Sequence, residues 1–272
     1  MASPHDFPPG LASVGIGAED FTGLVHYREA GIRFLEVEPL NRGWIPGDAA
    51  STRSFLELCK ANGVTPHSVH GYFFPHLGHG MTSPDAAARG EAIRLNRALF
   101  HAARDIGARY VVEHLQAACE DQSPEDEMAM ALEALRQLVP EAERTGVRIA
   151  VENLGPRWGV RQVQQLIGLA GSDHVGICFD TGHAALYGNL FEDLRLCGDR
   201  LMGLHVHDCG GGADHVLPYR GFIDWKRFGA ALRETGYRGV LMIEARRSSE
   251  SETTRDFVLA ARQAYDRLVG EL

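Results

Sequence analysis

The sequence lacks the features that mark disulfide-linked, thiolate-zinc or membrane-spanning proteins. Its five cysteines are an odd number, are widely separated and form no Cys-x-x-Cys pair. This pattern is typical of proteins in a reducing compartment, and it argues against a fold held together by disulfides or a zinc site made of thiolates. No apolar run approaches the roughly 18 residues that a transmembrane helix requires. The N-terminus has neither a basic start nor the apolar stretch of a signal peptide, so we expect a cytoplasmic protein.

Positive charge is also scarce. The formal net charge is −9 and the sequence pI is near 5.8, and no lysine-rich or arginine-rich run lies in the loops that follow the expected strands. DNA binding depends on neutralising phosphates, so nucleic acid is not expected as the main partner. We expect a small-molecule partner and no membrane association, and a homo-oligomer remains open.

A dinucleotide-binding open sheet is disfavoured, because no Gly-x-Gly-x-x-Gly joins the first expected strand to its helix. Instead, one unit recurs about every 30 residues: a β-branched run, a polar residue at its end, a loop and a helix closed by glycine. No shift in composition marks a linker. The pattern predicts a single (β/α)8 TIM barrel over residues 1–272, with residues 1–10 as a flexible tail. The expected strands are residues 11–16, 33–38, 64–70, 109–115, 147–152, 175–179, 201–208 and 240–244.

Helix starts are well marked in three places. Residues 83–85 (Ser-Pro-Asp) and 123–125 (Ser-Pro-Glu) each combine a capping hydroxyl, a proline suited to the first turn and an acid favoured by the helix dipole. We expect the serine to be the cap in both. Asp224 is expected to cap a third helix, whose buried side includes Trp225 and Phe228.

The stretch 175–183 (Val-Gly-Ile-Cys-Phe-Asp-Thr-Gly-His) is an apolar run that ends in Asp180 and is followed by His183. A carboxylate at a barrel mouth is costly to bury unless it is paired, and a divalent cation would pair it. A cap on the next helix explains Asp180 equally well. This stretch alone leaves both interpretations open.

Several expected strands end in an acid or a histidine. In a barrel these ends meet around one mouth, so the side chains are expected to converge there. Each of them alone could be a cap or a buried core residue, but a whole ring indicates a site for a divalent ion such as Mn²⁺, Mg²⁺, Co²⁺ or Zn²⁺. The ring consists of Glu36, Glu38, His70, His114, Glu152, Asp180, His207 and Glu244.

Short motifs follow in a fixed order along the second half of the chain. They are Ala-Val-Glu-Asn at 150–153, Cys-Phe-Asp-Thr-Gly-His at 178–183, His-Val-His-Asp at 205–208, Asp-His at 214–215, Gly-Phe-Ile-Asp-Trp at 221–225 and Ile-Glu at 243–244. With them the sequence resembles, over nearly its full length, the xylose isomerase-like TIM-barrel superfamily. This superfamily comprises sugar isomerases and epimerases together with endonuclease IV-type enzymes.

Similarity to the ketose 3-epimerases implies a chemistry and a set of roles. It implies one metal ion held by Glu152, Asp180, His207 and Glu244, with Glu152 and Glu244 as catalytic acid and base on opposite faces of the substrate. The implied reaction is isomerisation or epimerisation of a small ketose, sugar phosphate or related hydroxy-carbonyl compound through an enediolate. The residues expected to bind substrate are His70, His114, His183, His215, Arg220 and Arg246.

Both arginines have a second interpretation. The Pro-Gly-Glu-Gly turn usual in the family is Pro-Tyr-Arg-Gly at residues 218–221, so an acid is replaced by Arg220. Arg220, and likewise Arg246 just past Glu244, would hold an anionic substrate by a bidentate contact, or would be solvated loop residues.

Other functions remain open. Endonuclease IV-type enzymes have extra histidine ligands after the third and fourth strands, where this sequence has His70 and His114, so a second metal ion is a further expectation. Such enzymes have an acid where this chain has Ala213. An inosose dehydratase-like lyase would use the same mouth, and so would a metal-dependent binding protein without turnover.

Overall fold

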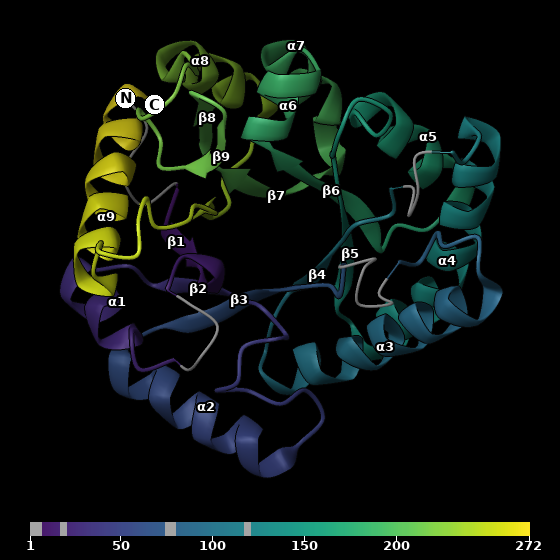
Figure 1. The fold of residues 1–272 in the computed structure, drawn as a ribbon, viewed down its shortest axis with the longest axis horizontal. Helices are drawn as coiled ribbons and strands as arrows, with labels where there is room; N and C mark the ends of the chain where they lie inside the picture. Colours follow the sequence, from purple (N-terminus) through teal and green to yellow (C-terminus); the bar gives the residue numbers. More distant parts are fainter. Residues whose placement is uncertain (1–6, 17–20, 74–79, 117–120) are drawn as a thin grey trace.

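A computed structural model describes residues 7–16, 21–73, 80–116 and 121–272. Eight parallel strands close into a barrel, and helices surround it (Figure 1), which confirms the predicted (β/α)8 architecture. Each strand pairs with its neighbours in chain order, and the last strand pairs with the first. The barrel strands are β1 (Pro9–Ala12), β2 (Phe34–Val37), β3 (Thr65–His70), β4 (Tyr110–Glu113), β5 (Arg148–Glu152), β6 (Val175–Asp180), β7 (Leu201–Val206) and β10 (Leu241–Ile243).

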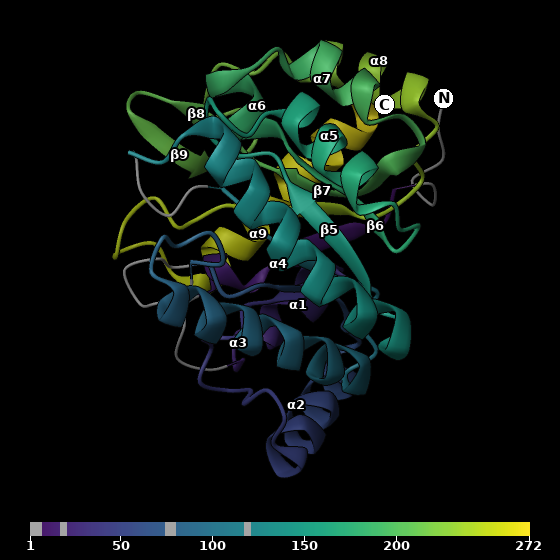
Figure 2. The ribbon, with the colours of Figure 1, turned by 90° about the vertical axis from the view of Figure 1, so that its right-hand side faces the viewer.

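Helices follow the strands, and a short antiparallel hairpin of β8 (Asp208–Gly210) and β9 (Ala213–Val216) projects at one end of the barrel (Figure 2). Among the described residues, no helix combines the length and apolar character needed to cross a bilayer. The helices are α1 (Leu24–Ala30), α2 (Ala49–Asn62), α3 (Ala86–Asp105), α4 (Pro124–Thr145), α5 (Val160–Ala170), α6 (Thr181–Tyr187), α7 (Leu190–Cys197), α8 (Trp225–Thr235) and α9 (Thr254–Glu271).

The N-terminal end of the chain is tied into the barrel earlier than expected. Phe7 is fully buried, and the backbone oxygen of Pro8 accepts a hydrogen bond from the Leu241 amide. The flexible tail expected over residues 1–10 therefore does not reach residue 10, while residues 1–6 lie outside the described residues. The expected first strand is also shifted, because the chain turns into a 3₁₀ helix at Ser13–Gly15 directly after β1.

Strand alternation separates two apolar regions. Leu35 and Val37 of β2 are buried in the large core between strands and helices, whereas Glu36 points the other way, into the barrel. The interior contains a small apolar cluster that includes Ala150 and Cys178. Ala150 and Glu152 therefore share the inner face, as the sequence predicts, and polar side chains lie above this cluster at the mouth.

The caps agree with the predictions in two of three cases. Ser123 caps α4 by accepting a hydrogen bond from the Asp126 amide, and Asp224 caps α8. At α3 the cap is Asp85 rather than the expected Ser83. The carboxylate of Asp85 accepts from two amides of the first turn. The hydroxyl of Ser83 accepts from the amide of Asp85, which precedes the helix, so Ser83 lies two residues too early to cap it.

The two candidate caps of α3 can be separated by mutation. We expect Asp85→Ala to lower the free energy of unfolding by about 1 kcal/mol, because it leaves two helical amides without an acceptor. Ser83→Ala is the matched control and should cost less than about 0.5 kcal/mol. Urea denaturation measures both values. A larger loss in Ser83→Ala would contradict the assignment.

Candidate active site

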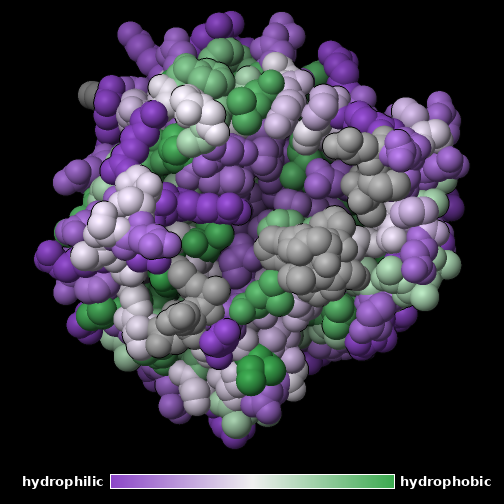
Figure 3. All heavy atoms as spheres, in the orientation of Figure 1, coloured by the Kyte–Doolittle hydropathy of each residue, from purple (hydrophilic) through white to green (hydrophobic). Residues whose placement is uncertain are grey.

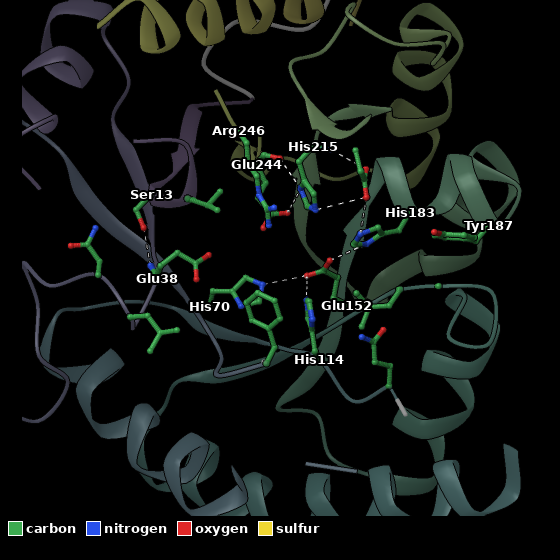
Figure 4. A pocket seen from close by; sticks show the side chains of 18 residues that line it. Ser13, Glu38, His70, His114, Glu152, His183, Tyr187, His215, Glu244 and Arg246 are labelled. Carbon is green, nitrogen blue, oxygen red and sulfur yellow. Dashed lines mark hydrogen bonds and ion pairs between the residues drawn. The ribbon is translucent and has the colours of Figure 1, made fainter. Parts of the chain in front are cut away.

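A cavity of about 500 Å³ opens where the carboxyl ends of the strands meet. Figure 3 shows a hollow near the centre of this face, with hydrophilic residues in its walls. Figure 4 shows the side chains around it, which come from several strand ends and the loops that follow them. The predicted residues that line the cavity are Glu38, His70, His114, Glu152, His183, His215, Glu244 and Arg246.

The structure places Arg220 differently from the other substrate-binding candidates. It is absent from the described lining of the cavity, and its guanidinium lies 3.8 Å from the carboxylate of Glu252. Replacement of the usual acid by Arg220 therefore leads to a loop ion pair. Arg246 does line the cavity, and its amide is anchored on the backbone oxygen of His215.

Four residues converge at the floor of the cavity, and the histidine among them is not the expected one. One potential ligand atom each from Glu152, Asp180, His205 and Glu244 lies within 4.8 Å of the others. His205 replaces the predicted His207 because β7 runs beside β6 in a register that pairs Asp180 with His205. Strand β7 then ends at Val206, so His207 lies beyond the inward alternation of the strand.

His207 instead belongs to a second group. One ring nitrogen each from His183, His207 and His215 lies within 4.8 Å of the others. The Nε2 atom of His207 is 2.8 Å from Asp180, and its amide is bound by the hydroxyl of Thr181. Gly182 leaves room for this ring, because a Cβ atom there would collide with it. The Asp-Thr-Gly-His motif thus shapes both groups.

Glu152 is surrounded by histidines. Its carboxylate oxygens lie 3.1 Å from His114 Nε2, 3.2 Å from His183 Nδ1 and 3.1 Å from His205 Nδ1. His205 Nδ1 is also 3.0 Å from Glu244. His70 is more distant from Glu152, at 3.8 Å. Five predicted site residues therefore lie in one network with His205.

Histidines keep the central acids ionised. Burial by itself would raise the pKa of Glu152, but His114 and His205 more than offset it and hold this pKa well below its usual value. Burial is likewise outweighed at Glu244, whose pKa is lowered chiefly by His205. Ionised carboxylates are the form that binds cations and abstracts protons.

Glu38 is a further acid on the cavity wall, and it behaves differently. Burial raises the pKa of Glu38 to about 7, and the partial compensation comes from His70. Among the described residues, the ligand atoms of Glu38, His70 and Glu244 also lie together. Glu38 belongs to the predicted ring of strand-end residues, and the structure places it in the cavity wall.

The four-residue group fits a divalent cation. Within the described chain, His205 Nδ1 and Glu244 Oε2 are buried and make no hydrogen bond. Such buried polar atoms are costly unless a partner satisfies them. Three carboxylates and one imidazole are a donor set suited to hard and borderline divalent ions. The expected second ion between His70 and His114 has less support, because His114 belongs to no such described group.

A buried acid anchors the hairpin that carries His215. Asp208 is fully buried and accepts hydrogen bonds from the amides of Cys209, Tyr219 and Ile223 and from the indole of Trp225. These donors span the turn between the β8–β9 hairpin and α8. Asp208 in the His-Val-His-Asp motif is thus an anchor of the mouth.

The chain is similar to known proteins over most of its length. A family model described as xylose isomerase-like TIM barrel matches residues 25–265. An uncharacterised protein, y4fM of Sinorhizobium fredii, is 31% identical over 68% of this chain and 64% of its own length. Inosose isomerase of Bacillus velezensis is 26% identical over 81% of both chains. A crystal structure of the IolI protein with a bound zinc atom superposes with a TM-score of 0.81, at 19% identity, over 96% of this chain and 98% of that chain.

The anchoring role of Asp208 can be tested through stability. We expect Asp208→Asn to lower the free energy of unfolding by about 3 kcal/mol, because an amide group turns a donor toward buried N–H groups. Asp224→Asn, on the same segment, is the control and should change stability by less than about 0.5 kcal/mol, since asparagine caps a helix as well as aspartate. Equal losses in both variants, measured by urea denaturation, would contradict this role.

Proposed function

Because the chain belongs to the xylose isomerase-like TIM-barrel family, we propose that it is a divalent-metal-dependent isomerase or epimerase of a small polyhydroxy carbonyl compound. One observation carries the proposal: three buried acids and His205 converge on the floor of a small cavity whose walls are rich in histidine. The relative named inosose isomerase supports the substrate class.

The residues that would hold the cation are Glu152, Asp180, His205 and Glu244. A divalent cation there would supply Lewis acidity that polarises a carbonyl group and a neighbouring hydroxyl. This set revises the ligands expected from sequence at one position, with His205 in place of His207. The zinc atom in the IolI structure, a protein of the same fold, is consistent with such a site.

Glu152 and Glu244 carry out the proton transfers in the proposed reaction. Both line the cavity, and both are kept ionised by neighbouring histidines, whose effect on each pKa outweighs that of burial. One carboxylate removes the proton from the carbon next to the carbonyl, and the C–H electron pair forms the enediolate. For isomerisation, the carboxyl group that took this proton returns it to the neighbouring carbon. For epimerisation, the second carboxylate takes a proton from water and delivers it to the opposite face.

The histidines on the wall orient the substrate. His70, His183 and His215 line the cavity (Figure 4). In each ring Nδ1 lies at hydrogen-bond distance from a backbone oxygen, which leaves Nε2 for a substrate oxygen. His114 also faces Glu152, at 3.1 Å. Arg246 remains the candidate for an anionic substituent, such as a carboxylate or phosphate, because Arg220 is paired outside the cavity.

A second candidate function is a multi-metal phosphodiesterase of the endonuclease IV type. The group of His183, His207 and His215 favours it, because three histidines around Asp214 offer a second cation site. The net charge of −9 weighs against DNA as a substrate. Two or more ions per chain by elemental analysis, together with salt-sensitive DNA binding, would favour this function over the first.

The proposed reaction predicts solvent exchange at a defined carbon. We expect the manganese-loaded protein, incubated in deuterium oxide with an inosose or a ketohexose, to place deuterium on the carbon next to the carbonyl, as followed by proton NMR. A panel of both classes without exchange or conversion, at full metal occupancy, would rule the proposal out.

Mutation of the proposed base gives a sharper result. Glu152→Gln should lower kcat at least about 100-fold, because the amide cannot accept the substrate proton. Glu113→Gln is the matched control, since Glu113 is a fully buried strand glutamate outside the described cavity lining. We expect its kcat to stay within about threefold of the wild type. Similar kcat values for Glu152→Gln and the wild type would refute the assignment.

Removal of the metal should affect both activity and stability. Dialysis against a chelator is expected to abolish turnover, and readdition of manganese or zinc should restore it. Saturation at 100 times the dissociation constant should raise the free energy of unfolding by about 2.7 kcal/mol over the metal-free protein. Thermal denaturation with and without the ion measures this shift. Chelator-resistant activity in protein shown to be free of metal would contradict metal dependence.

A further inference from the structure

We propose that Glu36, held by Ser68, is a positioning residue that fixes the ring of His205 so that Nδ1 is free to bind the cation. Neither residue lines the cavity, and both lie one layer deeper in the barrel. The inference rests on the proposed function, because it assigns a task to residues that support the same metal group.

Three strands bring the residues together. Glu36 of β2, Ser68 of β3 and His205 of β7 all point into the barrel and are fully buried. The hydroxyl of Ser68 donates to Glu36 Oε2 at 2.6 Å. The other oxygen, Oε1, lies 2.9 Å from His205 Nε2. The carboxylate thus spans from the hydroxyl to the imidazole.

The two nitrogens of His205 face different surroundings. Nε2 faces Glu36, whereas Nδ1 lies 3.0 Å from Glu244, 3.1 Å from Glu152 and 4.0 Å from Asp180. Glu36 belongs to none of the described groups whose ligand atoms lie together, so it is not itself a candidate ligand of the same ion. Its Oε1 atom faces Nε2, on the side of the imidazole ring away from the three acids.

The geometry between the Glu36 carboxylate and the His205 ring does not form a hydrogen bond in the structure. The two atoms are at hydrogen-bonding distance, yet Glu36 Oε1 and His205 Nε2 make no hydrogen bond with any described group. Because both atoms are buried and otherwise unsatisfied, a small rotation of the ring that forms this bond removes two costs at once. In the structure Nδ1 already lies within 4.0 Å of an oxygen of each of the three acids, so a small rotation does not require it to leave them.

The physical consequence concerns the position of one proton. A neutral imidazole carries its proton on one nitrogen and binds a cation through the other. A carboxylate that accepts from Nε2–H selects this tautomer, leaves the lone pair on Nδ1 and increases the basicity of the ring. Without Glu36, His205 is free to carry its proton on Nδ1, where it would form hydrogen bonds with Glu152 or Glu244 instead of binding an ion.

The first test is cation affinity in the full-length protein. Chelator-treated wild type and Glu36→Gln are titrated with manganese or cobalt by calorimetry, with no substrate present. We expect Glu36→Gln to bind about 10 to 100 times more weakly, the usual effect of removing an outer partner of a ligating histidine. Glu113→Gln, another buried strand glutamate, is the control and should bind within about twofold of wild type.

The second test reads the tautomer directly. In zinc-loaded protein labelled with ¹⁵N-histidine, long-range ¹H–¹⁵N spectra distinguish Nε2–H from Nδ1–H, and His205→Asn identifies the signal. We expect Nε2–H in the wild type and an increased Nδ1–H population in Glu36→Gln. The inference would be overturned if His205 of the wild-type protein carried its proton on Nδ1. It would also be overturned if Glu36→Gln bound the cation as tightly as the wild type.

A milder variant covers the case in which Glu36→Gln does not fold. Ser68→Ala leaves the charge of Glu36 in place but removes the hydroxyl that orients it, so affinity should fall by about 3 to 10 times. Unchanged affinity there would equally overturn the inference. The results distinguish this inference from the proposed function. If cation binding depends on Glu36 but no carbonyl substrate is turned over, only the proposed function is refuted. If a carbonyl substrate is turned over but cation binding does not depend on Glu36, only this inference is refuted.

Discussion

The structure depends on holding three ionised acids close together in a place that water hardly reaches. Glu152, Asp180 and Glu244 are buried, and their ligand atoms lie within 4.8 Å of one another. Such a cluster repels itself and loses hydration, both of which oppose ionisation. It is stable because histidines approach each acid, so that the pKa of Glu152 and that of Glu244 are lowered despite burial. The histidine content of the mouth is thus a requirement of the acid cluster.

Side chains that stabilise the acid cluster reach it from two sides, from above at the cavity mouth and from below in the barrel interior. Above the acids, helix α6 brings in His183 and the β8–β9 hairpin brings in His215, and the buried carboxylate of Asp208 anchors the segment that follows this hairpin. Below them, Glu36 approaches the far side of His205. The site is therefore built from strand ends, from loops and from the barrel interior, and all three depend on closure of the sheet.

Much of this site was readable in the sequence, residue by residue. The apolar run before Asp180 predicts a buried strand, and the acids at the ends of β5 and after β10 follow the same pattern. His205 and His207 illustrate the limit. Both alternate to the same side in an extended strand, and the sequence does not tell where β7 ends or which residue of β6 lies opposite. The register of Asp180 with His205 decided between them.

By itself the sequence determined the order of strands and helices, the barrel class and the identity of most residues at the mouth, because hydrophobic periodicity and strand-end polarity are local properties of the chain. Only the tertiary structure decided that His205 faces the acids, that Arg220 pairs with Glu252 and that Glu36 lies on the far side of His205 from these acids. These choices depend on strand register and loop path, which arise when distant segments pack and therefore leave no signal in any single segment.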